Sequence, residues 1–228
     1  AFAFSACNPS ETSEKENIVN VYTHRHYKAD DLLFSKFTEE TGIKVNIVNA
    51  SADELMQRLE TEGPNSQADI LITVDAGRLY RAQSKDLLQP VNSEVINANI
   101  PEKYREKNGL WYGMTHRARI IAYAKDRVNP DDIETYEDLA NPEFEGKILI
   151  RSSENVYNQS LLASIILADG EEQAREWAAG VVKNMARNPK CADRDQVKAV
   201  ASGEADIAVV NTYYIGLMLN DENVEERK

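Results

Sequence analysis

Short apolar runs alternate along the chain with amphipathic stretches of about ten residues. In the first half this pattern predicts, in order, strand 18–22, helix 30–41, strand 43–48, helix 52–62 and strand 68–74. Residues 51–54 form a capping box that opens the second helix. The first helix is expected to turn Leu33, Phe34 and Phe37 inward. Strands that alternate with helices are typical of βαβ units, so the pattern predicts an α/β fold with parallel-core sheets flanked by helices.

The second half continues this alternation after an irregular stretch. It predicts an extended crossing segment at 111–125, a short helix at 136–139, a strand at 146–150, helices at 156–167 and 171–185, and a helix opened by a capping box at 193–196. A last apolar run, 206–210, predicts a buried strand, and Tyr213 and Tyr214 stand where the next helix should begin. Ligands of open α/β sheets bind beyond the carboxyl ends of strands, so the tyrosine pair marks a candidate site.

The composition is that of an ordinary globular protein, with 42% hydrophobic and 28% charged residues among 228. This length accommodates one large domain or two smaller lobes. The net charge is −12, from 26 basic and 38 acidic residues. Nucleic-acid binders carry a basic surface, so no nucleic-acid partner is expected. The acidic balance suits a cationic ligand.

The first seven residues, A-F-A-F-S-A-C, are apolar or small, and a polar stretch follows them. Residues 1–17 are interpreted as a signal remnant and a polar tether. Cys7 is a lipidation candidate because its context resembles a bacterial lipoprotein cleavage site; the alternative is ordinary signal cleavage nearby. With Cys191 as the other cysteine, no disulfide framework is indicated. No run approaches the ~20 apolar residues of a membrane span, so contact with a membrane is expected only through a lipid anchor.

Tyrosines gather at or shortly after the carboxyl ends of three predicted strands, together with one histidine: His26, Tyr27, Tyr157, Tyr213 and Tyr214. A phenolate is a hard anionic ligand, although free tyrosine titrates only near pH ~10. Several phenolates at neutral pH therefore require a strongly polarising cation. Ferric iron is such a cation, whereas zinc prefers Cys and His and calcium prefers carboxylates and carbonyls. The pattern indicates a candidate iron site.

Three motifs carry a resemblance to a known family: R-H-Y at 25–27, S-S-E-N-V-Y-N-Q-S-L at 152–161 and N-T-Y-Y-x-G at 211–216. With them the chain resembles the ferric-iron-binding periplasmic proteins of bacterial ABC transporters, in the branch that uses four tyrosines and a histidine. The resemblance implies as direct ligands Tyr27, Tyr157, Tyr213 and Tyr214. It implies His26 as a fifth ligand, or as one that depends on redox state and closure, and Arg117 as a partner of the phenolates or of a bound anion.

The same resemblance implies a two-lobed, type II-like periplasmic binding protein, with an N-terminal lobe at 18–115 and a second lobe at 116–228. Iron(III), or alternatively iron(II), is the expected cargo, held in a cleft between the lobes with a synergistic anion or a water. The expected partners are an ABC permease and its ATPase, in the periplasm, for a monomer that catalyses no reaction. Family members are longer, so the second lobe is expected to be incomplete and the C-terminal part missing.

Two other functions stay open. One is a binding protein for a different small ligand, such as an oxyanion, a polyamine or a thiamine-like cofactor. The other is an enzyme in which Tyr213 or Tyr214 is a general acid/base and Arg117 holds a substrate carboxylate. The chain shows no nucleophile–base pair at a recognisable spacing. Arg119 and Arg151 could serve an anion, but pairing with acids on the surface is the expectation.

Overall fold

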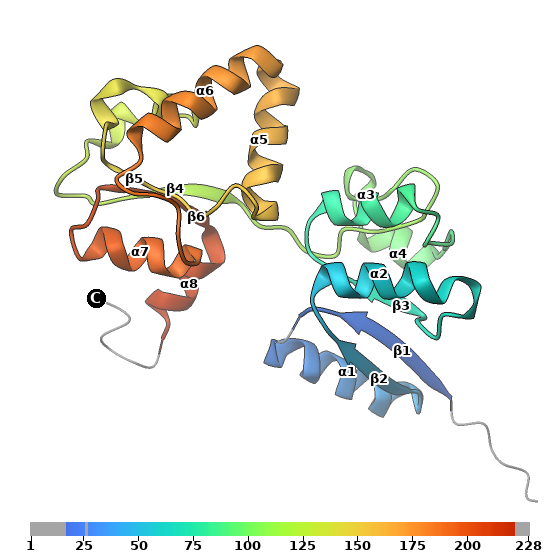
Figure 1. Ribbon diagram of the computed structural model, residues 1–228. Coiled ribbons are helices and arrows are strands. Elements are labelled where there is room, and N and C mark those ends of the chain that lie inside the picture. Colours follow the sequence, from blue (N-terminus) through green and yellow to red (C-terminus); the bar gives the residue numbers. More distant parts are fainter. Residues whose placement is uncertain (1–16, 26, 222–228) are drawn as a thin grey trace, which may run out of the picture. The chain divides into compact units, whose positions relative to one another are not determined.

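Figure 1 shows the computed structural model, which describes residues 17–25 and 27–221. Cys7, His26 and residues 1–16 of the predicted signal remnant and tether lie outside the described residues. The chain divides into two compact units, the first ending at Val91 and the second beginning at Asn92. The predicted lobe boundary between residues 115 and 116 stays a prediction.

The first unit is built on a parallel three-stranded sheet in the order β2-β1-β3. Its strands are β1 (Ile18–Thr23), β2 (Lys44–Asn49) and β3 (Ile70–Ile72). Its helices are α1 (Lys28–Thr41), α2 (Ala52–Glu62) and α3 (Ala76–Ser84), and a 3₁₀ turn spans Gly63–Asn65. In Figure 1, α1 and α2 lie on opposite faces of this sheet. Each parallel connection thus runs through a helix, as the alternating pattern predicted.

Helix α2 covers the core of the first unit because its apolar residues recur on one face. Leu55 and Leu59 are buried against Tyr22 of β1. The predicted capping box is confirmed: the Ser51 hydroxyl accepts from the Glu54 N–H at 3.3 Å, and the Glu54 carboxylate accepts from the Ser51 N–H at 2.9 Å. The Tyr22 hydroxyl donates to Glu62 at the end of α2, so the one polar atom of this ring is satisfied.

Helix α1 differs from the expectation, because it buries none of its side chains. Leu33 is 63% exposed and Phe37 is 39% exposed, while Phe34 is half-buried. The helix packs mainly on β2, which is an edge strand of a three-stranded sheet. So narrow a sheet has too little apolar area to cover the whole inner face of a helix of 14 residues.

The second unit is built on β4 (Arg119–Tyr123), β5 (Ile148–Leu149) and β6 (Ile207–Asn211), in the order β4-β6-β5. The central strand β6 is parallel to β5 and antiparallel to β4, so this sheet is mixed. The extended segment was predicted, but its direction was not. The helices are α4 (Glu94–Asn99), α5 (Val156–Asp169), α6 (Glu171–Asn184), α7 (Asp193–Ala201) and α8 (Thr212–Leu219). Short 3₁₀ turns span Glu102–Tyr104, Pro130–Asp132, Glu137–Ala140 and Pro142–Phe144, the third replacing the helix expected at 136–139.

Helices cover both faces of the second sheet, α5 and α6 on one side and α7 and α8 on the other (Figure 1). Ile207 and Val209 of β6 pack toward α5 and α6, whereas Ala208 and Val210 pack toward α7. All four are fully buried. A strand buried on both faces needs an unbroken apolar run, which is why this strand was recognisable in the sequence.

Among the residues that the structure describes, no helix combines the length and the apolar character needed to cross a bilayer.

Candidate metal centre

The pair Tyr213 and Tyr214 lies at the start of α8, as predicted. Strand β6 ends at Asn211, and the tyrosines are the second and third residues of the helix that follows. Their ring centroids are 4.3 Å apart, with an angle of 37° between the ring planes. The two phenols are therefore neighbours, although adjacent residues inside a helix diverge by about 100°.

Tyr157 reaches the same place from α5. Asn155 caps this helix by accepting a hydrogen bond from the Tyr157 N–H at 3.0 Å, which places Tyr157 in the first turn. Its hydroxyl oxygen lies 3.5 Å from the hydroxyl oxygen of Tyr213. Two helix starts, 56 residues apart in sequence, thus bring phenol oxygens together. The structure therefore gathers three of the predicted ligands, Tyr157, Tyr213 and Tyr214, in the second unit.

Burial raises the pKa of two of these phenols, those of Tyr157 and Tyr213, and so favours their neutral form. Burial raises the pKa of Tyr157 to about 12, and the hydroxyl of Tyr213 adds to the effect, while Arg117 and Arg151 act to lower it. Burial likewise raises the pKa of Tyr213 to about 12; there the hydrogen bond with Tyr157 acts in the lowering direction and Tyr214 in the raising direction. A ligand that uses these oxygens as phenolates must displace the protons, which demands a highly charged cation.

Three guanidinium groups surround the ring of Tyr157. The guanidinium carbon of Arg117 lies 4.2 Å from the ring centre, that of Arg151 5.8 Å and that of Arg119 6.0 Å. Arg117 thus lies beside Tyr157, and its role as a partner of the phenolates or of an anion stays a prediction. Positive charge beside a phenol favours its ionised form, so the cluster is suited to anionic oxygen.

Arg119 and Arg151 were expected to pair with acids on the surface, and for Arg119 this is wrong. Its side chain is 8% exposed and pairs with Asp193, whose side chain is 0% exposed. Arg151 approaches the same carboxylate, with its Nη1 3.6 Å from Asp193 Oδ1. Asp193 was predicted to cap α7, which is also wrong: Ala192 is the capping residue, and its N–H donates to Asp195 at 2.9 Å.

Sequence reasoning missed this buried ion pair because its members lie 74 positions apart. A signal was present: Arg119 stands beside the apolar run Ile120–Ile121 in a predicted extended segment, where an arginine must find a buried partner. The sequence offers many acids and does not indicate which one is the partner.

Tyr27 belongs to the first unit. It stands directly before α1, and its carbonyl accepts from the Asp30 N–H at 2.9 Å. The residue is 42% exposed, and the guanidinium carbon of Arg25 lies 5.2 Å from the centre of its ring. Asp30 holds Arg25 with two hydrogen bonds of 2.9 and 2.8 Å. The phenol is thus accessible and has a fixed positive charge next to it.

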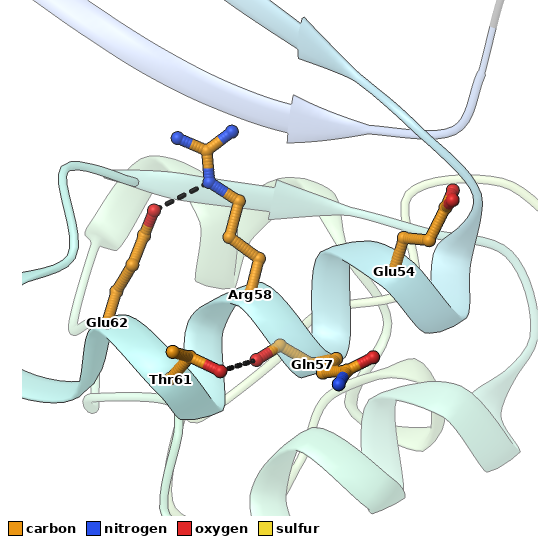
Figure 2. Close-up of a pocket in the computed structure, with 5 residues that line it drawn as sticks. All are labelled: Glu54, Gln57, Arg58, Thr61 and Glu62. Atoms are coloured by element: carbon orange, nitrogen blue, oxygen red, sulfur yellow. Dashed lines mark hydrogen bonds and ion pairs between the residues drawn. The ribbon is translucent and has the colours of Figure 1, made fainter.

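The described residues contain no cluster of three His, Cys, Asp or Glu side chains able to hold a metal ion. A surface pocket of about 400 Å³ lies along α2 and is lined by Glu54, Gln57, Arg58, Thr61 and Glu62 (Figure 2). Its Arg58 is bound to Glu62 at 2.6 Å, and the Thr61 hydroxyl donates to the Gln57 carbonyl. These are ordinary contacts within one helix, so the tyrosine group remains the candidate site.

An α/β fold with polar side chains gathered at helix starts beyond strand ends is typical of proteins that bind small ligands. The protein family described as bacterial extracellular solute-binding protein matches residues 65–226, and this chain belongs to it.

Relatives of the chain include iron-binding proteins. It is 49% identical over 218 residues to iron uptake protein A1 of Synechocystis sp. The matched region covers 96% of this chain and 61% of the relative. It is 26% identical over 212 residues to the major ferric iron-binding protein of Neisseria meningitidis, covering 91% of this chain and 62% of that one. The chain thus spans about three fifths of the length of the curated relatives it matches.

Solved structures confirm the fold class. A Trichodesmium protein in complex with iron and citrate ligands superposes with a TM-score of 0.87 at 46% identity, over 92% of this chain and 66% of that one. A ferric binding protein from Campylobacter jejuni gives a TM-score of 0.86 at 49% identity, over 91% of this chain and 66% of that one. The fold is therefore the mixed α/β fold of the two-lobed periplasmic binding proteins.

Proposed function

We propose that this chain belongs to a binding protein that captures iron(III) outside the cytoplasm by tyrosinate coordination and delivers it to an ABC-type importer. The observation that carries the proposal is the 3.5 Å separation of the Tyr157 and Tyr213 hydroxyl oxygens, with Tyr214 alongside. Oxygens at this spacing can both contact one small, highly charged ion, whose metal–oxygen distances are about 2 Å. The relatives named for iron uptake and ferric binding support the choice of ion.

The proposed ligands are Tyr27, Tyr157, Tyr213 and Tyr214, with His26 as a fifth or conditional one. The last three tyrosines are adjacent in the second unit. Tyr27 and His26 join the set through the R-H-Y motif. Four phenolates on a trivalent ion leave a net charge of about −1, which the guanidinium of Arg117 is placed to offset.

An anion is a natural companion of the ion at this site. Arg117, Arg119 and Arg151 lie around Tyr157, and the one carboxylate paired with them, Asp193, leaves a net positive charge beside the phenol. One similar structure is described as holding citrate together with iron. We propose that a carboxylate or carbonate-like anion, or a water, completes the coordination beside Arg117.

In the cell, the proposed carrier works outside the cytoplasm with an importer in the membrane. The permease and its ATPase are the partners expected of an extracellular solute-binding protein, and the family assignment supports them. Lipidation of Cys7 would tether the protein to the membrane. The relatives are named as binding and uptake proteins, which supports a carrier without a catalysed reaction. We propose that this carrier is a monomer.

The test is a visible absorption titration with chelated ferric iron. The wild-type protein should turn orange to red through phenolate-to-iron charge transfer and saturate at one equivalent. The Tyr213→Phe/Tyr214→Phe variant should lose the band, whereas Tyr80→Phe, a change at a 64% exposed tyrosine of α3, should retain it. A folded wild-type protein that stays colourless would contradict the proposal and favour an oxyanion or an organic ligand.

A further inference from the structure

One buried carboxylate, that of Asp193, binds both Arg119 and the strand end that leads into the tyrosine pair. Asp193 Oδ2 accepts a hydrogen bond from the guanidinium of Arg119 and a second, of 3.0 Å, from the backbone N–H of Asn211. Asn211 is the last residue of β6 and stands two residues before Tyr213. Asp193, the first residue of α7, thereby fixes Asn211, the residue after which β6 gives way to α8 with its two tyrosines.

The same guanidinium reaches the other tyrosine-bearing helix. Arg119 Nη2 donates to Asn158 Oδ1 at 2.7 Å and to the Val209 carbonyl at 3.0 Å, and Nη1 donates to Asn211 Oδ1 at 3.1 Å. Asn158 directly follows Tyr157 in α5. Its own amide donates to the carbonyl of Arg151 at 2.7 Å, in the segment that leads into this helix.

Arg119 and Asp193 therefore belong to a continuous set of hydrogen bonds from Asn158 to Asn211. Asp193, Asn158 and Asn211 are all buried, so these bonds are shielded from competing water. The guanidinium offers its donors in a rigid planar fork, which fixes directions as well as distances. Outer partners of this kind orient metal ligands in many proteins, and their loss weakens metal binding by roughly 10- to 100-fold.

We infer that Arg119 and Asp193 are positioning residues of the iron site, which set the spacing of Tyr157 and Tyr213 through Asn158 and Asn211. This inference rests on the proposed function. Arg119 acts through its neighbours, because its guanidinium carbon is 6.0 Å from the ring centre of Tyr157. This buried ion pair thus holds the first turns of α5 and α8 at the separation that one ion requires.

The chain supplies a matched control at the opposite end of the same two strands. Arg127 follows β4 and Asp206 precedes β6, and they form an ion pair of 2.8 Å. Arg127 also donates to the carbonyls of Val200 and Ala205, at 2.7 and 3.3 Å. The pair Arg127–Asp206 joins the segments of β4 and β6, and the pair Arg119–Asp193 joins β4 to α7. Only Arg119–Asp193 is hydrogen-bonded to Asn158 and Asn211, which lie one and two residues from a tyrosine.

The experiment compares Arg119→Lys and Asp193→Asn with Arg127→Lys and Asp206→Asn, all loaded with ferric iron. We expect the first two variants to shift the charge-transfer maximum, to absorb less per bound iron and to release iron to a competing chelator roughly 10- to 100-fold faster. The second two should match the wild-type protein. Arg119→Lys keeps the positive charge and loses the planar fork of donors. A shifted band or a faster release of iron in this variant would therefore assign the effect to geometry and not to charge.

A thermal unfolding curve of each metal-free variant separates positioning from stability, since a merely structural role lowers the unfolding temperature and leaves the band of the folded protein unchanged. Should the ion-pair variants not fold, Asn158→Ala removes the link to α5 and leaves the pair intact, and it should still shift the band. Folded variants with the wild-type spectrum and release rate would overturn the inference. A wild-type protein without the band would instead reject the proposed function.

Discussion

The hydroxyl oxygens of Tyr157 and Tyr213 lie 3.5 Å apart, at the starts of two helices that meet at one end of the second sheet. Each helix begins within two residues of its tyrosine, so backbone geometry rather than side-chain flexibility determines the meeting point. Burial keeps both phenols protonated in the metal-free protein, with a pKa of about 12 for each. An ion that binds them as phenolates must therefore supply the free energy needed to displace their protons.

Iron binding should release protons and strengthen with pH. Below pH ~12 each of Tyr157 and Tyr213 must lose one proton to become a ligand, so the affinity should rise about tenfold per pH unit for each of them. Titrations at a fixed concentration of free ferric ion and several pH values measure this slope. The Tyr213→Phe variant should lower the slope by about one proton, and an affinity that does not change with pH would rule out phenolate ligands.

The metal-free protein should lose stability in alkali. The folded-state pKa values of Tyr157 and Tyr213, about 12, exceed the unfolded value near 10. Their neutral forms therefore stabilise the fold fully below pH ~10, and this contribution disappears as the pH rises toward ~12. Urea denaturation across this window should show a smaller loss of stability for Tyr213→Phe than for the wild type. Equal losses in the two proteins would show that the buried phenol does not contribute.

Arg117→Gln should weaken iron binding. The guanidinium of Arg117 is 4.2 Å from the ring centre of Tyr157 and lowers the pKa of this phenol, so its loss makes the phenolate harder to form. We expect a roughly tenfold lower affinity at neutral pH and iron loading that requires a higher pH. Arg175→Gln is the control, because Arg175 lies on the surface of α6 in a pair with Glu171. An unchanged affinity would remove Arg117 from the site.

Gly180→Ala should destabilise the second unit. A Cβ atom at Gly180 would lie 2.7 Å from the Cβ of Ala140, where α6 packs closely on the neighbouring 3₁₀ turn. Overpacking of this kind typically costs about 1–3 kcal/mol. Gly216→Ala in α8 is a matched control, since its Cβ meets no atom within 4 Å and alanine favours the helix by roughly 0.5–1 kcal/mol. Fluorescence of Trp177 in α6 during denaturation reports on both; similar stabilities would contradict the packing argument.

Local patterns in the sequence were sufficient for much of this architecture. The capping box at Ser51, the buried run of β6 and the helix start that bears Tyr213 depend on neighbours a few residues away, and all three are confirmed. The motif resemblance reached further, to the family and to the fold class.

Other features could not be read in this way. The direction of β4 depends on its pairing with β6, about 90 residues later, and the exposure of Leu33 depends on the width of a sheet. The prediction for Asp193 was wrong because a carboxylate at a helix start satisfies the local capping pattern whether it faces the backbone or a distant arginine.

The sequence by itself determined which residues could be ligands and placed Tyr213 and Tyr214 at a helix start, because these properties belong to residue types and short-range spacing. Only the tertiary structure decided that Tyr157 meets Tyr213 and that Arg119 pairs with Asp193. Those contacts join residues 56 and 74 positions apart, and they form because the packing of helices on a shared sheet leaves one place for each side chain.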